Sequence, residues 1–315
     1  MLGRMIEHLF DEHGVTLRRD PVATGVHDQA ILRLRRSGSL LRVRHGVYVD
    51  PMRWETASPQ LRHLMLSRGV LRMYGDDVAL SHTSAAMAYG APDWAIPLKD
   101  VHLTDLYSAG ERRQASVHHH QGACDVHDVR RLGGHWITTP VRTALDAASV
   151  LPRSPAVVLL DHFLHAGLLT KADLALSLSR RQQWSSHLDV LLKVDQSQVG
   201  SESIGESRAR LLFQDHGLAT PVLQFEIHDD AGALIGRADF AWPSQRLIVE
   251  FDGMTKYHRL RRPGETVEQA VVREKLREDR MRDEGWTVLR MTWWDLEHPG
   301  PFVGRLQSRL ARPAA

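Results

Sequence analysis

The segment that most constrains the fold is RLIVEFDGMTKYH, residues 246–258, because it places two carboxylates inside an apolar, β-branched run. Glu250 and Asp252 are two residues apart, so on a β-strand both side chains point to the same face. Charged side chains are seldom buried without a partner. The segment therefore predicts a strand whose acidic face meets either a metal ion or a basic side chain.

The sequence around this strand predicts an α/β domain. A helix over residues 203–217 precedes strands at 221–228, 233–242 and 246–253, and a long helix at 266–285, a strand at 286–293 and a helix at 301–310 follow. The order is αβββαβα. Asp239 lies on the strand before the acidic one, so it can sit beside Glu250 and Asp252. Three converging carboxylates suit Mg²⁺ or Mn²⁺, and such an ion supports phosphodiester cleavage by activating water.

Two other interpretations of these residues need no metal. The acidic pair can lie on a solvated strand edge, or Arg237, Arg273 or Arg277 can neutralise it. The charges of the long helix can also be an exposed face stabilised by pairs three or four residues apart. The tryptophans near the C-terminus are expected to fill the core behind the sheet.

The motifs GRADF and VEFDG, followed by a helix rich in both charges, resemble the PD-(D/E)XK nuclease superfamily, specifically its Vsr-like branch, over residues 200–312. The resemblance implies a restriction-endonuclease-like fold in which Asp239 and Glu250 bind metal and Glu206 assists. It also implies a lysine two residues after the glutamate, but that position is Asp252. Lys256 or Lys275 can take the place of this lysine, Asp252 can be a further metal ligand, and His258 can act as a general acid or base.

The first 55 residues predict a winged helix-turn-helix. Short helical segments are followed by the hairpin LLRVRHGVYVD, residues 40–50. In the third helical segment, Ile31 and Leu34 face inward while Arg33, Arg35 and Arg36 lie on other faces, so this helix could enter a major groove. Arg42 and Arg44 project from one face of the hairpin, where they are expected to contact phosphate. A solvated basic helix in a protein-docking domain is the alternative.

Residues 56–195 predict a middle α/β domain, and a polar Gly- and Ser-containing stretch places a boundary near residue 195, before a C-terminal domain at 196–315. His118, His119 and His120, with Cys124 and His127 after them, suggest a zinc site. Adjacent strand residues point to opposite sides and the spacing matches no zinc pattern, so we expect a surface strand.

The GVYVD hairpin, with SHTSAA and TPVRTALD after it, resembles the AbiEi-type antitoxins and transcriptional regulators over residues 1–180. That resemblance implies DNA binding and promoter control. Two functions therefore compete. The first is a DNA-binding, metal-dependent endonuclease. The second is an AbiEi-like repressor or antitoxin whose nuclease-like domain has lost catalysis and grips DNA or a toxin. An RNA-directed nuclease is weaker, because both resemblances favour duplex DNA.

Bulk composition limits the partners. The net charge is +2, yet 40 residues are basic, and only five of these are lysines. DNA contacts must therefore come from local arginine patches, and Arg259, Arg261 and Arg262 are further candidates for phosphate contact. A single cysteine and the lack of a long apolar run predict a cytoplasmic protein with no membrane partner. A cognate toxin or a second copy of the chain is a possible protein partner.

Overall fold

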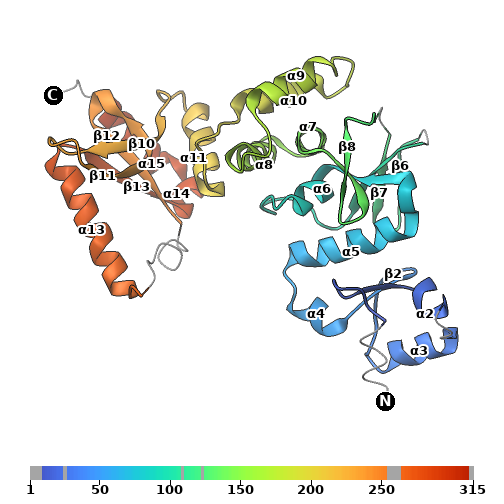
Figure 1. Cartoon of the computed structure of the whole chain (residues 1–315). Helices are drawn as coiled ribbons and strands as arrows, with labels where there is room; N and C mark the ends of the chain where they lie inside the picture. Colours follow the sequence, from blue (N-terminus) through green and yellow to red (C-terminus); the bar gives the residue numbers. More distant parts are fainter. Residues whose placement is uncertain (1–8, 24–26, 108–109, 122–123, 254–263, 312–315) are drawn as a thin grey trace. The chain divides into compact units, whose positions relative to one another are not determined.

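The computed structural model describes residues 9–23, 27–107, 110–121, 124–253 and 264–311 (Figure 1). The chain divides into two compact units, Met1–Asp195 and Gln196–Ala315. Each unit mixes helices with a β-sheet, as the sequence predicts. Within the described ranges, no helix has the length and apolar character needed to cross a bilayer.

The first part of unit 1 is a small sheet with two short helices. The elements are β1 (Val15–Leu17), α2 (Arg19–Ala23), α3 (Asp28–Arg36), β2 (Leu41–Arg44) and β3 (Val47–Val49), and the strands run antiparallel in the order β1-β3-β2. The hairpin β2–β3 and helix α3 match the expectation from sequence. Strand β1 was not expected, because a stretch of three residues is too short to show the alternation of apolar and polar side chains that predicts a strand.

This small sheet packs on helix α5 (Pro59–Tyr74), which follows α4 (Pro51–Thr56). Val15, Val47 and Met65 share one buried cluster. At Gly69 of α5, an added Cβ would lie 2.3 Å from Val47 Cγ1, so the glycine allows the helix to approach the strand. Arg72 of α5 also forms an ion pair with Asp11, in which Nη1 lies 3.0 Å from Oδ2.

The rest of unit 1 contains a six-stranded sheet and a helical layer. The strand order is β6-β7-β5-β4-β9-β8, with β4/β9 and β5/β7 parallel. The strands are β4 (Val78–Leu80), β5 (Val101–Asp105), β6 (Arg112–Gln114), β7 (Val117–His120), β8 (Val129–Leu132) and β9 (His135–Thr138). The helices are η1 (Gly75–Asp77), α6 (His82–Ala88), α7 (Pro140–Val150), α8 (Arg153–His165), α9 (Lys171–Ser179) and α10 (His187–Gln196).

Unit 2 has a four-stranded sheet in the order β10-β11-β12-β13, in which β12 and β13 are parallel. Its elements are α11 (Ile204–Asp215), β10 (Val222–His228), β11 (Leu234–Trp242), η2 (Pro243–Gln245), β12 (Leu247–Asp252), α13 (Val267–Asp283), β13 (Thr287–Thr292), α14 (Trp293–Glu297) and α15 (Pro299–Leu310). The order follows the αβββαβα expectation, with the last helix divided into α14 and α15.

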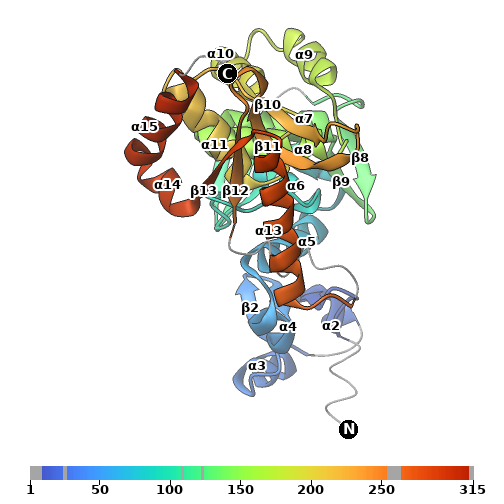
Figure 2. The same ribbon diagram turned by 90° about the vertical axis from the view of Figure 1, so that its left-hand side faces the viewer.

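Helices cover both faces of this sheet (Figures 1 and 2). One buried cluster joins Phe213 of α11, Phe251 of β12 and Phe302 of α15. The other joins Ile248 of β12 to Met281 of α13. Because strand side chains alternate, Glu250 and Asp252 lie on the same face as Ile248, which is the face that α13 covers.

Candidate functional site

The first candidate site is the basic surface of α3 and β2. Helix α3 buries Ile31 and Leu34, and this turns Arg33 and Arg36 outward to solvent, with Arg35 half-buried between them. Arg42 on β2 is exposed as well. These four side chains make no ion pair with the part of the chain that the structure describes. Their positive charges are therefore available to phosphate, the contact that supplies most of the affinity of DNA-binding proteins.

Arg44 has different surroundings from these four. Its Nε donates a hydrogen bond to the carbonyl oxygen of Ala115 at 3.0 Å, and its guanidinium lies 6.0 Å from the ring centroid of Tyr74. Arg44 thus joins the hairpin to the six-stranded sheet. The hairpin bulge between Arg42 and Arg44 changes the register of β2 against β3, so simple alternation does not describe where these two arginines point.

The second candidate site is the acidic cluster of unit 2, and Glu250 is its most buried member on the sheet. Glu250 Oε1 accepts a hydrogen bond from Arg277 Nη2 at 2.6 Å. Burial raises the pKa of Glu250, and the Asp239 charge adds to this, while Arg277 opposes both. Burial alone would lower the pKa of Arg277. The pKa is nevertheless raised, because the carboxylates of Glu274 and Glu250 accept hydrogen bonds from the guanidinium and stabilise its positive charge. Of the neutralising partners considered from sequence, the structure places Arg277 against Glu250.

The other two acids are also engaged. Asp239 Oδ2 accepts a hydrogen bond from the backbone N–H of Phe251 at 2.8 Å, which links β11 to β12. Asp252 Oδ2 lies 3.7 Å from Arg290 Nη1, a residue of the parallel neighbour β13. Within the described part of the chain, the carboxylates of Asp239, Glu250 and Asp252 do not lie close enough together to form a three-ligand metal group.

Glu206 lies in the first turn of α11 and is buried. It accepts hydrogen bonds from the Glu202 N–H at 2.9 Å, from Ser203 Oγ at 2.7 Å and from Gln224 Nε2 at 3.0 Å. Ser203 in turn caps the helix by accepting from the Glu206 N–H. These contacts give Glu206 a structural part in fixing the start of α11.

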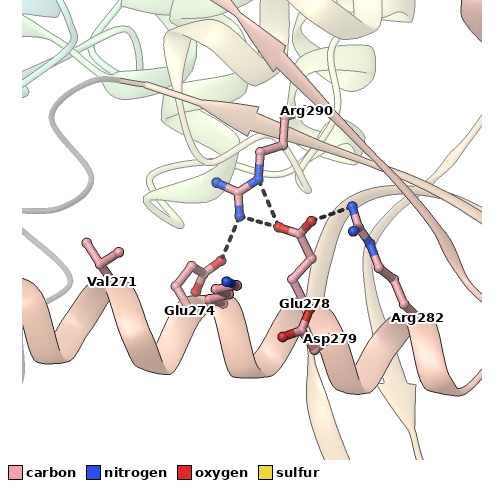
Figure 3. Close-up of a pocket in the computed structure, with 7 residues that line it drawn as sticks. Val271, Glu274, Glu278, Asp279, Arg282 and Arg290 are labelled. Atoms are coloured by element: carbon pink, nitrogen blue, oxygen red, sulfur yellow. Dashed lines mark hydrogen bonds and ion pairs between the residues drawn. The ribbon is translucent and has the colours of Figure 1, made fainter.

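A shallow pocket lies between α13 and β13 beside the acidic cluster (Figure 3). Arg290 reaches over α13, with Nη2 2.5 Å from Glu278 Oε2 and 4.0 Å from Glu274 Oε1. Glu278 also holds Arg282 at 2.6 Å. Lys275, a possible replacement for the nuclease lysine, is exposed at the rim of this pocket. Lys256, His258, Arg259, Arg261 and Arg262 lie outside the described residues.

Comparison with known proteins bears on the first site. Residues 4–49 match the model of the family described as "Transcriptional regulator, AbiEi antitoxin". This segment contains α3 and the β2–β3 hairpin. Two Mycobacterium tuberculosis proteins are each 28% identical to this chain over 281 residues, which is 88% of this chain and 93% of theirs. They are named uncharacterized protein MT2308, from strain CDC 1551 / Oshkosh, and uncharacterized protein Rv2248, from strain ATCC 25618 / H37Rv.

Proposed function

We propose that this protein binds DNA through α3 and β2 and acts as a transcriptional regulator or antitoxin of the AbiEi type. The observation that carries the proposal is the exposure of three arginines, Arg33, Arg36 and Arg42, inside the segment that matches that family. In this winged helix-turn-helix, α3 is the helix that enters the major groove, and the hairpin contacts the neighbouring backbone. An antitoxin of this type also has a toxin partner, which we expect to be encoded beside it.

Replacing both Arg33 and Arg36 by alanine should weaken binding to a DNA fragment from upstream of the protein's own gene by roughly tenfold at 0.15 M salt. Each lost phosphate contact reduces the magnitude of the slope of log affinity against log salt concentration by about one. The slope of the double variant should therefore be smaller by about two. Fluorescence anisotropy at several salt concentrations measures both quantities.

The matched control is Arg180→Ala, which removes an exposed arginine that follows α9. It should keep both the affinity and the salt slope of the unmodified protein. Equal losses in the control and in the double variant would mean that overall charge, and not the α3 surface, drives the binding.

The second candidate function is a metal-dependent endonuclease with a restriction-endonuclease-like domain in residues 196–315. Two features favour it: the element order of unit 2, and the strand register that pairs Phe240 with Val249 and so places Asp239 next to Glu250 on the neighbouring strand. Arg277 donates a hydrogen bond to Glu250 Oε1 and the Phe251 N–H donates one to Asp239 Oδ2. A divalent ion bound by these acids would therefore compete with the Arg277 cation for Glu250.

If the endonuclease proposal holds, the protein should nick supercoiled plasmid in the presence of Mn²⁺. Asp239→Asn and Glu250→Gln should each slow nicking at least tenfold, because a neutral amide binds a divalent ion less well than a carboxylate does. The matched control is Glu297→Gln, which removes an exposed acid of α14 and should cut at the unmodified rate. Equal background cutting by all four proteins would remove this candidate and leave the DNA-binding regulator.

A further inference from the structure

A cluster of histidines lies in unit 1, on one face of the parallel strands β5 and β7. The register pairs His102 with His118 and Thr104 with His120. Because side chains alternate along a strand, His102, His118 and His120 point to the same side of the sheet, while His119 points to the other. His119 is there held by Asp105, whose Oδ1 lies 2.7 Å from its Nδ1.

The sequence alone predicted a surface strand here, and that expectation is wrong. His119 and His120 are buried and His118 is half-buried. His119 points away from its two neighbours, as alternation along a strand requires. His102 was not expected as a partner, because a contact with another strand is known only when the strand register is known.

The three imidazoles on the shared face are close enough to bind a single ion. One nitrogen from each of His102, His118 and His120 lies within 4.8 Å of the other two, and this is the metal-capable triplet found in the described ranges. His102 Nδ1 is 2.8 Å from His120 Nε2. Around Zn²⁺, nitrogen ligands at about 2.0–2.1 Å in tetrahedral geometry are roughly 3.3 Å apart. Small side-chain movements therefore convert the present arrangement into a coordinating one.

Neighbouring groups support this cluster in the way that metal-site surroundings do. Glu111 Oε1 lies 2.8 Å from His118 Nε2, a distance at which the imidazole donates to the carboxylate, as metal-binding histidines commonly do. His82 stacks on His120 with ring centroids 3.6 Å apart. The backbone of His82 has φ 51°, in the left-handed region, so a strained conformation holds the ring over the cluster.

Among the described residues, a polar side chain beside the cluster is also left without a partner. Thr104 Oγ1, on the same strand face, is buried and has no hydrogen-bond partner within the described part of the chain.

We propose that His102, His118 and His120 form a binding site for one divalent transition-metal ion of the zinc class. Three imidazole nitrogens favour Zn²⁺, Co²⁺ or Ni²⁺ over Mg²⁺ and Ca²⁺, which prefer oxygen ligands. A fourth coordination position remains for water or for a further ligand. This site is separate from the acidic residues of unit 2 and does not depend on either proposed function.

The test uses full-length protein purified without a histidine tag, stripped with EDTA and then exchanged into metal-free buffer. Titration with Zn²⁺ should load one ion per chain, as measured by elemental analysis after desalting. Co²⁺ should give the visible absorption bands of a four-coordinate site, and Zn²⁺ should raise the melting temperature by several degrees. Mg²⁺ should neither stay bound after desalting nor raise the melting temperature.

His118→Gln and His120→Gln should each lose the bound ion, the Co²⁺ bands and the thermal shift. The control is His127→Gln, an exposed histidine nearby in sequence, which should keep all three. Circular dichroism identifies any variant that fails to fold, and His118→Gln is the safer of the two because His118 is half-buried. Failure of folded, unmodified protein to retain Zn²⁺ overturns the proposal, and so does equal retention by His118→Gln.

Discussion

Replacing Arg142 by methionine should lower the free energy of unfolding of unit 1 by about 3–5 kcal/mol, because removing one member of a buried ion pair leaves an uncompensated charge. The Arg142 side chain is 4% exposed. Its Nε lies 2.8 Å from Asp146 Oδ1 and its Nη1 lies 2.8 Å from Asp128 Oδ2. Urea unfolding of the full chain measures the loss of stability. Hydrogen exchange of the α7 amides then shows whether the loss lies in unit 1.

The control for this prediction is Arg131→Met, which breaks the exposed pair of Arg131 with Asp76. Exposed pairs contribute little, so no comparable loss should occur. The double variant Arg142→Met/Asp146→Leu should recover part of the stability, because the buried carboxylate is then absent as well. Equal stability of the Arg142→Met and Arg131→Met proteins would contradict the buried ion network.

The loss caused by Arg142→Met should also grow with pH. Burial raises the pKa of Asp146 from 3.8 to about 6 even with Arg142 present. Without the guanidinium this pKa rises further, so the folded variant holds a proton that the unfolded chain releases above about pH 4. A native state that binds more protons loses stability as pH rises. The destabilisation should therefore be larger at pH 7.5 than at pH 5.

Local sequence signals predicted the elements well where one segment determines its own conformation. The apolar spacing of Ile31 and Leu34 gave the inward face of α3, and the helix expected over residues 203–217 is α11, with Glu206 in its first turn. The αβββαβα order of unit 2 followed from alternating and helical periodicity. In each case the residues that carry the signal are neighbours along the chain, so tertiary packing is not needed to interpret them.

Contacts between distant segments were not determined by the sequence. From the sequence, the partner of Glu250 was expected to be a metal ion or an arginine, and the described structure has Arg277, which is 27 residues away. Three arginines were possible partners, and only the docking of α13 on the sheet selects one. The contact of Arg44 with Ala115 and that of His102 with His118 likewise depend on which strands become neighbours.

Gly205→Ala should lower the free energy of unfolding of unit 2 by roughly 2 kcal/mol. This loss is expected although alanine is more favourable than glycine inside a helix by about 1 kcal/mol. An ideal Cβ at Gly205 would lie 2.0 Å from Phe251 Cε1. Phe251 is 2% exposed and packs edge-on against Trp293 at 5.1 Å, so its ring has little space to withdraw. Overpacking of this kind costs about 1–3 kcal/mol or more, and here it should exceed the helix preference.

Gly304→Ala on α15 is the matched control, because nothing lies within 4 Å of an added Cβ there and the substitution should be neutral or stabilising. In the double variant Gly205→Ala/Phe251→Leu, the smaller side chain should relieve the clash, so the two effects should not add. Chemical denaturation of the unmodified protein, Gly205→Ala, Phe251→Leu and the double variant measures this coupling. If Gly205→Ala were as stable as Gly304→Ala, α11 would not pack on β12 with Gly205 against Phe251.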